Sequence, residues 1–286
     1  MKKICLFLWF AVFITFSNHA QYYFNYSAVF NGSSSYVAVP SSNEILLPCS
    51  TGKITIEAWI NPTSISNYPT ICGKRYLSSF WFGINVTGSL RLYPQGGTYM
   101  DGNGIIPLNK WTHVAATFNG DTARLYINGV LDKESVTFSG PIGNNTDSLF
   151  IGCDRDGAVL NYFFKGEIDN LRIWCVSRTL KQINETMFMP LQIGGDPNKI
   201  NVYNGLIASY NFDGSCWDWS GSFDNGTAHH ITYNSKGSDP LTYCDFNNHL
   251  ILDGKSYCSA RNSNDFNATT TLTIEAHSNW LPMVVD

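Results

Sequence analysis

Charged residues are scarce in this chain of 286 residues. Asp, Glu, Lys and Arg make up only 14% of it, and the 18 basic residues are scattered rather than gathered into a run. Binding to nucleic acid depends on a clustered positive surface. The composition therefore predicts no nucleic-acid partner, and the formal net charge of −4 points the same way.

Long apolar runs are missing after the first 20 residues. A transmembrane helix needs roughly 20 apolar residues in a row, and no later stretch approaches that length. The start of the chain has Lys2 and Lys3, an apolar run from Ile4 to Phe16 and the small residue Ala20. This pattern is typical of a secretory signal peptide over residues 1–20, so we expect an exported protein without a transmembrane segment.

Closely spaced cysteines are also absent. Of the 8 cysteines, Cys5 lies in the signal peptide, and none of the other seven forms a Cys-x-x-Cys unit, so the sequence does not support a zinc site. Export permits disulfide bonds, but an odd number of cysteines leaves the pairing open. The seven are Cys49, Cys72, Cys153, Cys175, Cys216, Cys244 and Cys258.

What the sequence does contain is strand periodicity. In residues 110–131, apolar and polar residues alternate in two successive runs, and each run is followed by an Asn-Gly pair. Asn-Gly supplies the positive φ angles of tight hairpins, so Asn119-Gly120 and Asn128-Gly129 predict two chain reversals. We expect three adjacent antiparallel strands here.

The remainder of the chain from Tyr22 onward continues in short β-like runs separated by Gly, Asn, Ser and Pro clusters. This spacing predicts an all-β sandwich. A short stretch at residues 178–187 is the one segment that we expect to be helical, as a turn that closes the fold.

The order of the segments resembles a known family. FNGSSSYVAVP, ITIEAWI, KWTHVAATFNGDTARLYINGVL, SLFIG and FFKGEIDNLRIWCVSRTL follow one another as in laminin G-like jelly-roll domains of the concanavalin A-like lectin and glucanase superfamily. The resemblance covers roughly residues 28–189, one whole module. It implies two antiparallel sheets packed face to face with jelly-roll connectivity.

We place this jelly-roll domain at residues 21–190, followed by a Gly-, Asn- and Pro-rich linker at 191–205. Residues 206–286 look like the beginning of a second module of the same type. LDGKSY at 252–257 parallels FNGSSSY at 30–36, and LTIEAHSNW parallels ITIEAWINP. Because no counterpart of residues 110–131 follows, we expect the second module to be incomplete.

Catalytic signals are weak. β-Glucanases of the superfamily carry a Glu, an Asp two residues later and a second Glu after that, because alternate strand residues face one cleft. Glu167 and Asp169 resemble the first two, but the second Glu is missing. A retaining mechanism needs two carboxylic acids, so we predict no enzyme and a structural role for both residues. The His229-His230 pair is a further candidate for a metal or a base.

The segment after residue 151 is a candidate calcium site. Asp154 and Asp156 are spaced by two with Gly157 after them, a pattern that can turn several oxygens toward one ion. The loop resembles that of pentraxins, which implies carboxylate ligands from Asp154 and Asp156 and a carbonyl ligand from Arg155. The further acids of pentraxins are absent, so we expect at most one weak site. A solvated Asp-rich turn is the alternative.

Aromatic residues make up 14% of the chain. Exposed aromatic rings stack on sugars in many lectin-like modules, and our candidates for ligand contacts are Trp81, Tyr93, Tyr99 and Tyr126. Packing in the sandwich core is the alternative role for each of them.

The sequence thus predicts a secreted, non-catalytic module that binds a glycan or another extracellular polymer. A protein-adhesion or structural domain of a multi-module surface protein is the second hypothesis, and a glucanase is the third. The choice rests on family resemblance, and the same sandwich serves all three functions.

Overall fold

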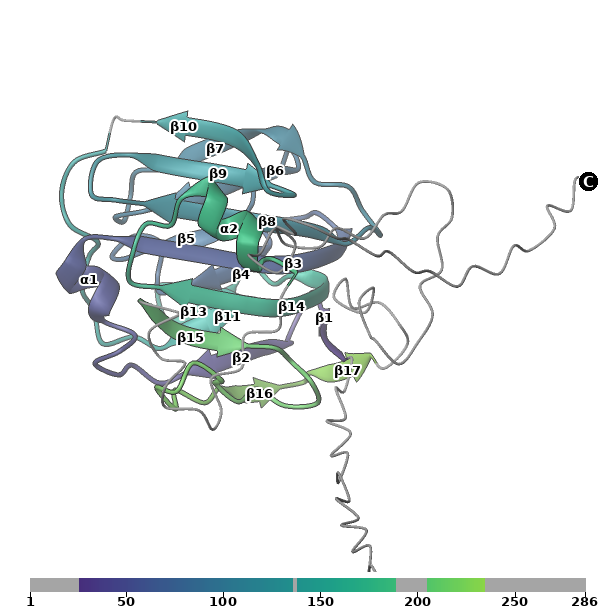
Figure 1. Cartoon of the computed structure of the whole chain (residues 1–286). Helices are drawn as coiled ribbons and strands as arrows, with labels where there is room; N and C mark the ends of the chain where they lie inside the picture. Colours follow the sequence, from purple (N-terminus) through teal and green to yellow (C-terminus); the bar gives the residue numbers. More distant parts are fainter. Residues whose placement is uncertain (1–25, 136–137, 189–204, 235–286) are drawn as a thin grey trace, which may run out of the picture.

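The computed structural model describes residues 26–135, 138–188 and 205–234. Within these ranges two antiparallel sheets are stacked face to face, as Figure 1 shows, and they enclose one large apolar core. The predicted all-β jelly-roll sandwich is confirmed.

The larger sheet has eight strands in the order β10-β9-β8-β3-β14-β1-β17, with β15 also paired to β14. Its strands are β1 (Ser27–Asn31), β3 (Ile54–Ser64), β8 (Thr112–Phe118), β9 (Ala123–Ile127), β10 (Val130–Ser135), β14 (Lys165–Trp174), β15 (Leu206–Tyr210) and β17 (Thr232–Asn234).

The smaller sheet has seven strands in the order β16-β2-β11-β4-β5-β6-β7. Its strands are β2 (Tyr36–Val39), β4 (Thr70–Gly73), β5 (Trp81–Ile84), β6 (Ser89–Tyr93), β7 (Met100–Ile105), β11 (Leu149–Ile151) and β16 (Thr227–His229). A two-stranded hairpin, β12 (Asp154–Asp156) and β13 (Val159–Asn161), follows β11, and the helices are α1 (Leu47–Thr51) and α2 (Leu180–Thr186).

The two predicted hairpins are present. β8, β9 and β10 are adjacent and antiparallel, and the turn between β9 and β10 places Asn128 at φ 48° and Gly129 at φ 68°. Both angles lie in the left-handed region that this two-residue turn requires. The side chain of Asn128 also accepts a hydrogen bond from the backbone N–H of His113 at 3.0 Å, which fixes the turn against β8.

Helix α2 covers the outer face of the larger sheet. Ile183 of the helix packs on Ala115 of β8 and Tyr126 of β9, so β8 is buried on both faces. The helix begins with a capping box, in which Thr179 and Gln182 exchange side-chain and backbone hydrogen bonds. The predicted closing helix is therefore confirmed, and it is anchored at its first turn.

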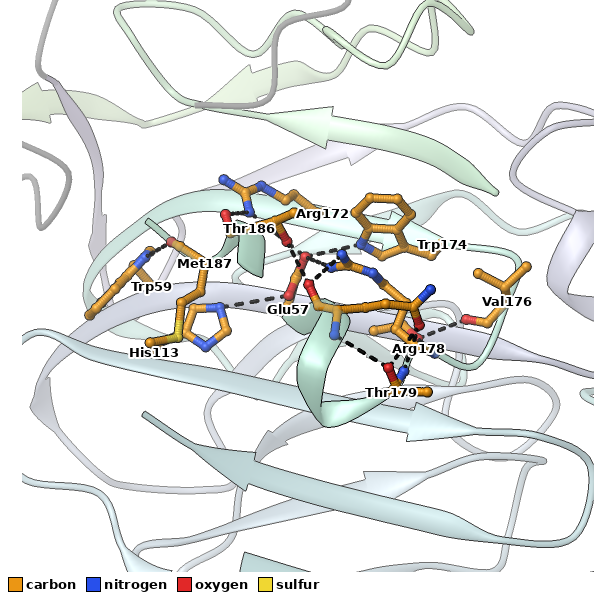
Figure 2. A network of polar contacts seen from close by, with 12 residues as sticks. Glu57, Trp59, His113, Arg172, Trp174, Val176, Arg178, Thr179, Thr186 and Met187 are labelled. Carbon is orange, nitrogen blue, oxygen red and sulfur yellow. Dashed lines mark hydrogen bonds and ion pairs between the residues drawn. The ribbon is translucent and has the colours of Figure 1, made fainter. Parts of the chain in front are cut away.

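A buried polar network lies beneath α2, with Glu57 of β3 at its centre (Figure 2). Arg178 and the indole N–H of Trp174 donate to Glu57 Oε1 at 2.8 and 3.1 Å, and Arg172 lies 3.7 Å from the same oxygen. Glu57 itself is 0% exposed. A carboxylate removed from water needs such partners, because an unpaired buried charge is strongly destabilising.

The same network holds the end of α2. Arg172 donates to the carbonyl of Thr186 at 2.8 Å, and the indole of Trp59 donates to the carbonyl of Met187 at 2.8 Å (Figure 2). The last carbonyls of a helix have no partner within the helix. The sheet therefore supplies donors at the place where the helix lacks them, and α2 is fixed at both ends.

Strands β15, β16 and β17 correct the predicted domain boundary. β15 pairs with β14, β16 with β2 and β17 with β1, so residues 206–234 complete the two sheets of the first domain. The expectation that a second module begins at residue 206 is wrong for this segment. The edges of β14, β1 and β2 need these partners, and a local sequence pattern does not show which edge a strand will join.

The other predicted segments of the chain cannot be compared with the structure, because they lie outside the described residues. The signal peptide, residues 191–204 of the linker and the repeat at 252–280 lie outside the described residues, so they stay predictions. No helix in the part of the chain that the structure describes is both long and apolar enough to cross a membrane.

Candidate ligand-binding site

The outer face of the smaller sheet carries two rows of side chains that point away from the core. Trp81 of β5 lies opposite Tyr93 of β6, and the neighbouring row contains Gly83, Arg91 and Asp101. Strand alternation separates these residues from their core-facing neighbours. The neighbours within the core are Phe82, Leu90 and Leu92.

Two glycines make room for the indole ring of Trp81. A Cβ atom on Gly83 would stand 2.5 Å from Cη2 of the ring, and one on Gly73 would stand 2.8 Å from Cδ1. The ring therefore lies over both glycines, and its N–H donates to Thr70 Oγ1 at 2.8 Å. Trp81 forms a fixed aromatic floor on the sheet.

Three tyrosines from loops stand around this floor. Tyr68 precedes β4, Tyr76 lies between β4 and β5, and Tyr162 follows β13. Tyr162 meets Tyr76 and Tyr68 edge to face, with ring centres 5.8 and 6.3 Å apart, and Tyr76 meets Tyr93 in the same way at 5.5 Å. Such contacts between rings are favourable and directional.

The loops that carry these tyrosines have strained backbones. Tyr68 has φ 55° and Tyr162 has φ 59°, in a region that bulky residues rarely adopt. Each such residue costs on the order of 1–3 kcal/mol and persists only when its surroundings hold it. Here the N–H of Thr70 donates to the carbonyl of Tyr162 at 2.9 Å, and Asn67 donates to Asn161 at 3.0 Å, so the two loops support each other.

Floor and walls enclose a pocket of about 190 Å³. Drug-sized ligands occupy pockets of about 300–1,000 Å³, so this pocket has room for one ring-sized group. Five aromatic side chains and one guanidinium line it: Tyr68, Tyr76, Trp81, Arg91, Tyr93 and Tyr162.

Arg91 is the cation among the lining residues, and Asp101 neutralises it. The two side chains form two hydrogen bonds of 2.6 Å, and the guanidinium also lies 3.8 Å from the ring centre of Tyr99. Burial lowers the pKa of Arg91, but the hydrogen bond and charge of Asp101 outweigh it and raise that pKa above its usual value. Burial raises the pKa of Asp101, and the bond to Arg91 brings it below its usual value. Both groups are therefore ionised.

The structure brings together three of the four aromatic residues predicted for ligand contacts. The rings of Trp81 and Tyr93 lie 5.9 Å apart, and those of Tyr93 and Tyr99 lie 5.2 Å apart. Tyr126 does not join them, because it lies on the other sheet, where Ile183 of α2 packs over it. Exposure alone does not separate the candidates, since Trp81 is 2% and Tyr126 3% exposed, but Trp81 lines the pocket and Tyr126 does not. The expected ligand contact of Tyr126 is therefore not at this pocket, and ligand contact by the other three stays a prediction.

The predicted calcium carboxylates both have protein donors. Asp154 is 0% exposed and accepts the backbone N–H groups of Arg75 and Tyr76 at 3.1 and 3.0 Å. Burial raises the pKa of Asp154 to about 6, against the opposing effect of backbone hydrogen bonds. Asp156 accepts the hydroxyl of Tyr162 at 3.1 Å, and the Arg155 guanidinium lies 3.8 Å from Asp147.

A metal would need more ligands than these. Calcium takes 6–8 oxygens, and among the described residues no group of three or more His, Cys, Asp or Glu could hold a metal ion. Calcium binding at Asp154, Arg155 and Asp156 therefore stays a prediction that the protein ligands alone do not complete.

A model described as the concanavalin A-like lectin/glucanases superfamily matches residues 31–184, more than half of the chain. The chain belongs to this superfamily. The resemblance found in the sequence is thereby confirmed.

Two solved structures have a similar fold at low sequence identity. A candidate carbohydrate-binding protein from Bacteroides ovatus has 23% identity and a TM-score of 0.58, over 74% of this chain and 60% of that one. A heptameric SAP-like pentraxin from Limulus polyphemus has 16% identity and a TM-score of 0.50, over 76% of this chain and 98% of that one. At these identities the likeness is one of fold.

A further relative is much longer than this chain. Pappalysin-1 from Mus musculus is 33% identical over 82 residues, and its human counterpart is 30% identical over 82 residues. Each match covers 27% of this chain and 5% of pappalysin-1. The similarity therefore concerns one short stretch of those proteins.

Glu167 and Asp169, the two acids that resemble those of glucanases, make hydrogen bonds to the protein itself. Glu167 accepts hydrogen bonds from Ser27 of β1 at 2.5 Å and from Asn234 of β17 at 3.1 Å, so it joins neighbouring strands to β14. Asp169 is 0% exposed and accepts the N–H of Asn170 at 2.8 Å. These contacts agree with the predicted structural role.

The remaining candidates have structural surroundings too. His229 stacks on the ring of Tyr36 with centres 4.3 Å apart, and His230 sits in a left-handed turn at φ 52°. Cys72, Cys153, Cys175 and Cys216 are free thiols. The side chain of Cys49, together with Cys244 and Cys258, lies outside the described part, so the predicted disulfides stay untested.

Sequence reasoning missed Arg91 and the three wall tyrosines. Arg91 was recognisable in principle, because it lies two residues before Tyr93 on a predicted strand and must share its face. Tyr68, Tyr76 and Tyr162 come from separate loops and meet only in the folded chain. The positive φ angles of Tyr68 and Tyr162, at residues that rarely adopt them, have no signature in the sequence.

Proposed function

We propose that the protein is an exported, non-catalytic module that binds a glycan in the aromatic pocket of the smaller sheet. The observation that carries the proposal is the pocket itself, in which five aromatic rings and Arg91 surround about 190 Å³. Aromatic rings provide apolar faces for the C–H surfaces of a sugar, while phenolic hydroxyls and a guanidinium offer hydrogen bonds to its hydroxyls. The fold shared with the Bacteroides ovatus protein agrees with this proposal.

The first test is a glycan array with wild-type protein and three variants. Tyr68 and Tyr93 line the pocket, so Tyr68→Ala and Tyr93→Ala should each weaken binding by about tenfold, or about 1.4 kcal/mol. Trp217 is 61% exposed and is not one of the lining residues, so Trp217→Ala is the matched control and should bind normally. Binding that survives both tyrosine changes would place the ligand elsewhere.

The array should be run with calcium and with a chelator. Calcium assistance through Asp154, Arg155 and Asp156 predicts that the chelator abolishes binding. The pocket alone predicts no such loss. The same protein should release no reducing sugar from β-glucans, and turnover that Glu167→Gln removes would contradict a non-catalytic role.

A protein partner is the second candidate function, and exposed aromatic residues favour it. Trp217 and Phe223 are 61% and 80% exposed on the segment between β15 and β16. Aromatic residues are enriched at protein interfaces. This function predicts no array signal and binding to a panel of purified extracellular matrix proteins that Trp217→Ala with Phe223→Ser removes, while Tyr93→Ala leaves it intact.

A further inference from the structure

The one cation among the described residues that line the pocket, Arg91, is held by a carboxylate. Arg91 of β6 and Asp101 of β7 lie directly opposite each other in the register of the smaller sheet. Nε and Nη2 of Arg91 donate to the two carboxylate oxygens of Asp101, each at 2.6 Å. Such a fork of two charge-assisted hydrogen bonds is a strong and directional pairing. The strand pairing therefore positions the ion pair before any ligand binds.

Aromatic rings also hold the guanidinium in place. It lies 3.8 Å from the ring centre of Tyr99 and 5.1 Å from that of Tyr68. The ring quadrupole attracts a cation, and the attraction is larger where water is displaced, as it is for the Arg91 side chain at 12% exposed. Arg91 can turn toward a bound anion only by breaking both hydrogen bonds to Asp101 and both of these ring contacts.

The charged groups behind the pocket walls offer an anion no better partner. Asp156 accepts the hydroxyl of Tyr162 at 3.1 Å, so a carboxylate lies behind one wall. Arg75 and Arg155 lie 3.3 and 3.8 Å from Asp147, and neither of them lines the pocket. Each of the three arginines at the pocket or behind it thus has a carboxylate partner.

We propose that the ion pair of Arg91 and Asp101 makes the pocket select uncharged sugars over sugars that carry a carboxylate. The inference rests on the proposed glycan function and names the class of sugar. A ligand carboxylate would lie beside the like charge of Asp101 and would find the charge of Arg91 already compensated. Like charges brought together in an interface weaken binding, and so does an anion that leaves water without a partner. A neutral sugar incurs neither cost.

Arg91 still has donors for a neutral sugar. A guanidinium carries five N–H groups, and Asp101 accepts from two of them. The others can donate to sugar hydroxyls, whose oxygens accept hydrogen bonds without bringing a charge. Arg91 therefore serves the pocket as a fixed polar donor beside the aromatic floor.

Paired trisaccharides test the preference. The probes are trisaccharides of gluco-, galacto- and manno-configured uronic acids, each beside its carboxyl-reduced form, which keeps the rings and linkages and has a neutral CH₂OH group in place of each carboxylate. At neutral pH we expect the full-length protein to bind at least one reduced form and to bind the matching acid at least about tenfold more weakly.

The outcomes separate this inference from the proposed function. An acid that binds as tightly as its reduced form would overturn the preference and leave the glycan function standing. Binding of neither form of any pair would contradict the glycan function and the preference together.

Charge variants distinguish repulsion by Asp101 from a poor fit of the acid. The quantity compared is the affinity for the acid divided by the affinity for its reduced form. Asp101→Asn removes the negative charge and keeps one acceptor oxygen for Arg91, so this ratio should rise by about tenfold. Asp121→Asn makes the same change of charge at an exposed position between β8 and β9, and it should leave the ratio unchanged.

Circular dichroism shows whether each variant is folded. A folded Asp101→Asn variant with the wild-type ratio would overturn the proposal, because the weak binding of the acid would then not depend on the charge of Asp101. If Asp101→Asn does not fold, the comparison of acid and reduced forms in the wild-type protein still decides whether the pocket prefers uncharged sugars.

Discussion

Removing everything after Pro190 would strip three strands from the sandwich. β15 would leave β14, β16 would leave β2, and β17 would leave β1, so both sheets would lose edge partners. The loss also reaches the core, because Ile207, Tyr210 and Phe212 are buried in it. We therefore expect a chain that ends at Pro190 not to fold.

The magnitude can be worked from these three side chains. Burying one large apolar side chain contributes about 1.5–3 kcal/mol, so Ile207, Tyr210 and Phe212 together account for about 5–9 kcal/mol. Single domains are stable by only about 5–15 kcal/mol in total. The lost strand pairing and the newly exposed partner surfaces add to the cost. Little or no stability should remain.

Urea unfolding followed by circular dichroism measures the effect. The matched control is a chain that ends at Asn234, which keeps every described strand and should unfold cooperatively near the midpoint of the full-length protein. A smaller change should act in the same direction: Tyr210→Phe removes the hydroxyl that donates to the carbonyl of Asp224 at 2.7 Å, at a cost of about 1–3 kcal/mol. If the chain ending at Pro190 unfolds with the same midpoint as the control, residues 206–234 are not part of the domain.

Two further predictions concern the pocket and its acids. Gly83→Ala would put a methyl group 2.5 Å from the Trp81 ring and 2.4 Å from the carbonyl of Pro69, so it should destabilise the protein by about 1–3 kcal/mol, shift tryptophan fluorescence and weaken glycan binding. Unchanged fluorescence and binding would show that Trp81 is not seated over Gly83. The predicted weak calcium site should appear as a gradual rise in Tm across a calcium titration. The free energy of unfolding should increase by about 2.7 kcal/mol when calcium reaches about 100 times Kd. The double variant Asp154→Asn with Asp156→Asn should not show that rise. An unchanged Tm in the wild-type protein would show that neither acid binds calcium.

The sequence predicted those features that depend on neighbouring residues. The hairpins of β8, β9 and β10 follow from local alternation and two Asn-Gly turns, and α2 lies within the stretch at 178–187 that was expected to be helical. Local alternation does not show what covers the far side of a strand. The sequence of β9 contains no sign that α2 lies over Tyr126, so the expectation of an exposed ring was wrong.

Features that depend on distant pairing were harder to predict. Residues 206–234 contain strand-like runs that suit an opening module as well as a closing one, and only their pairing with β14, β1 and β2 decides between them. The pocket was hard to predict for the same reason. Its floor was predicted in part, since Trp81 and Tyr93 lie on strands, whereas its walls depend on the meeting of the loops at 67–70 and 161–162.

Two buried titratable groups should give the protein opposing pH dependences. Burial, with the charges of Arg172 and Arg178, lowers the pKa of His113 to about 3, below its usual 6.5. The stability that neutral His113 contributes is therefore complete above about pH 6.5 and is lost as the pH falls toward 3. Burial raises the pKa of Asp154 to about 6, above its usual 3.8. Asp154 binds its proton more tightly when folded, so its contribution falls as the pH rises from about 4 to 6.

The two effects overlap between about pH 4 and 6. One pKa unit corresponds to about 1.4 kcal/mol, so each group changes the free energy of unfolding by up to about 3 kcal/mol across this window, in opposite directions. In the wild type they should nearly cancel. A variant that lacks one group should therefore show the pH dependence of stability that the other group causes. Other carboxyl groups add a pH dependence that all variants share.

Urea unfolding at several pH values between about 4 and 6 tests this cancellation, with each variant compared to the wild type so that the shared background drops out. His113→Phe leaves Asp154 unopposed, so relative to the wild type this variant should gain stability as the pH falls. Asp154→Asn leaves His113 unopposed and should lose stability over the same change. Two variants with the wild-type slope would contradict the burial of both groups. Because His113 lies beneath α2 and Asp154 lies behind the pocket wall, an opposite pair of slopes would also show that both of these regions stay closed to water in solution.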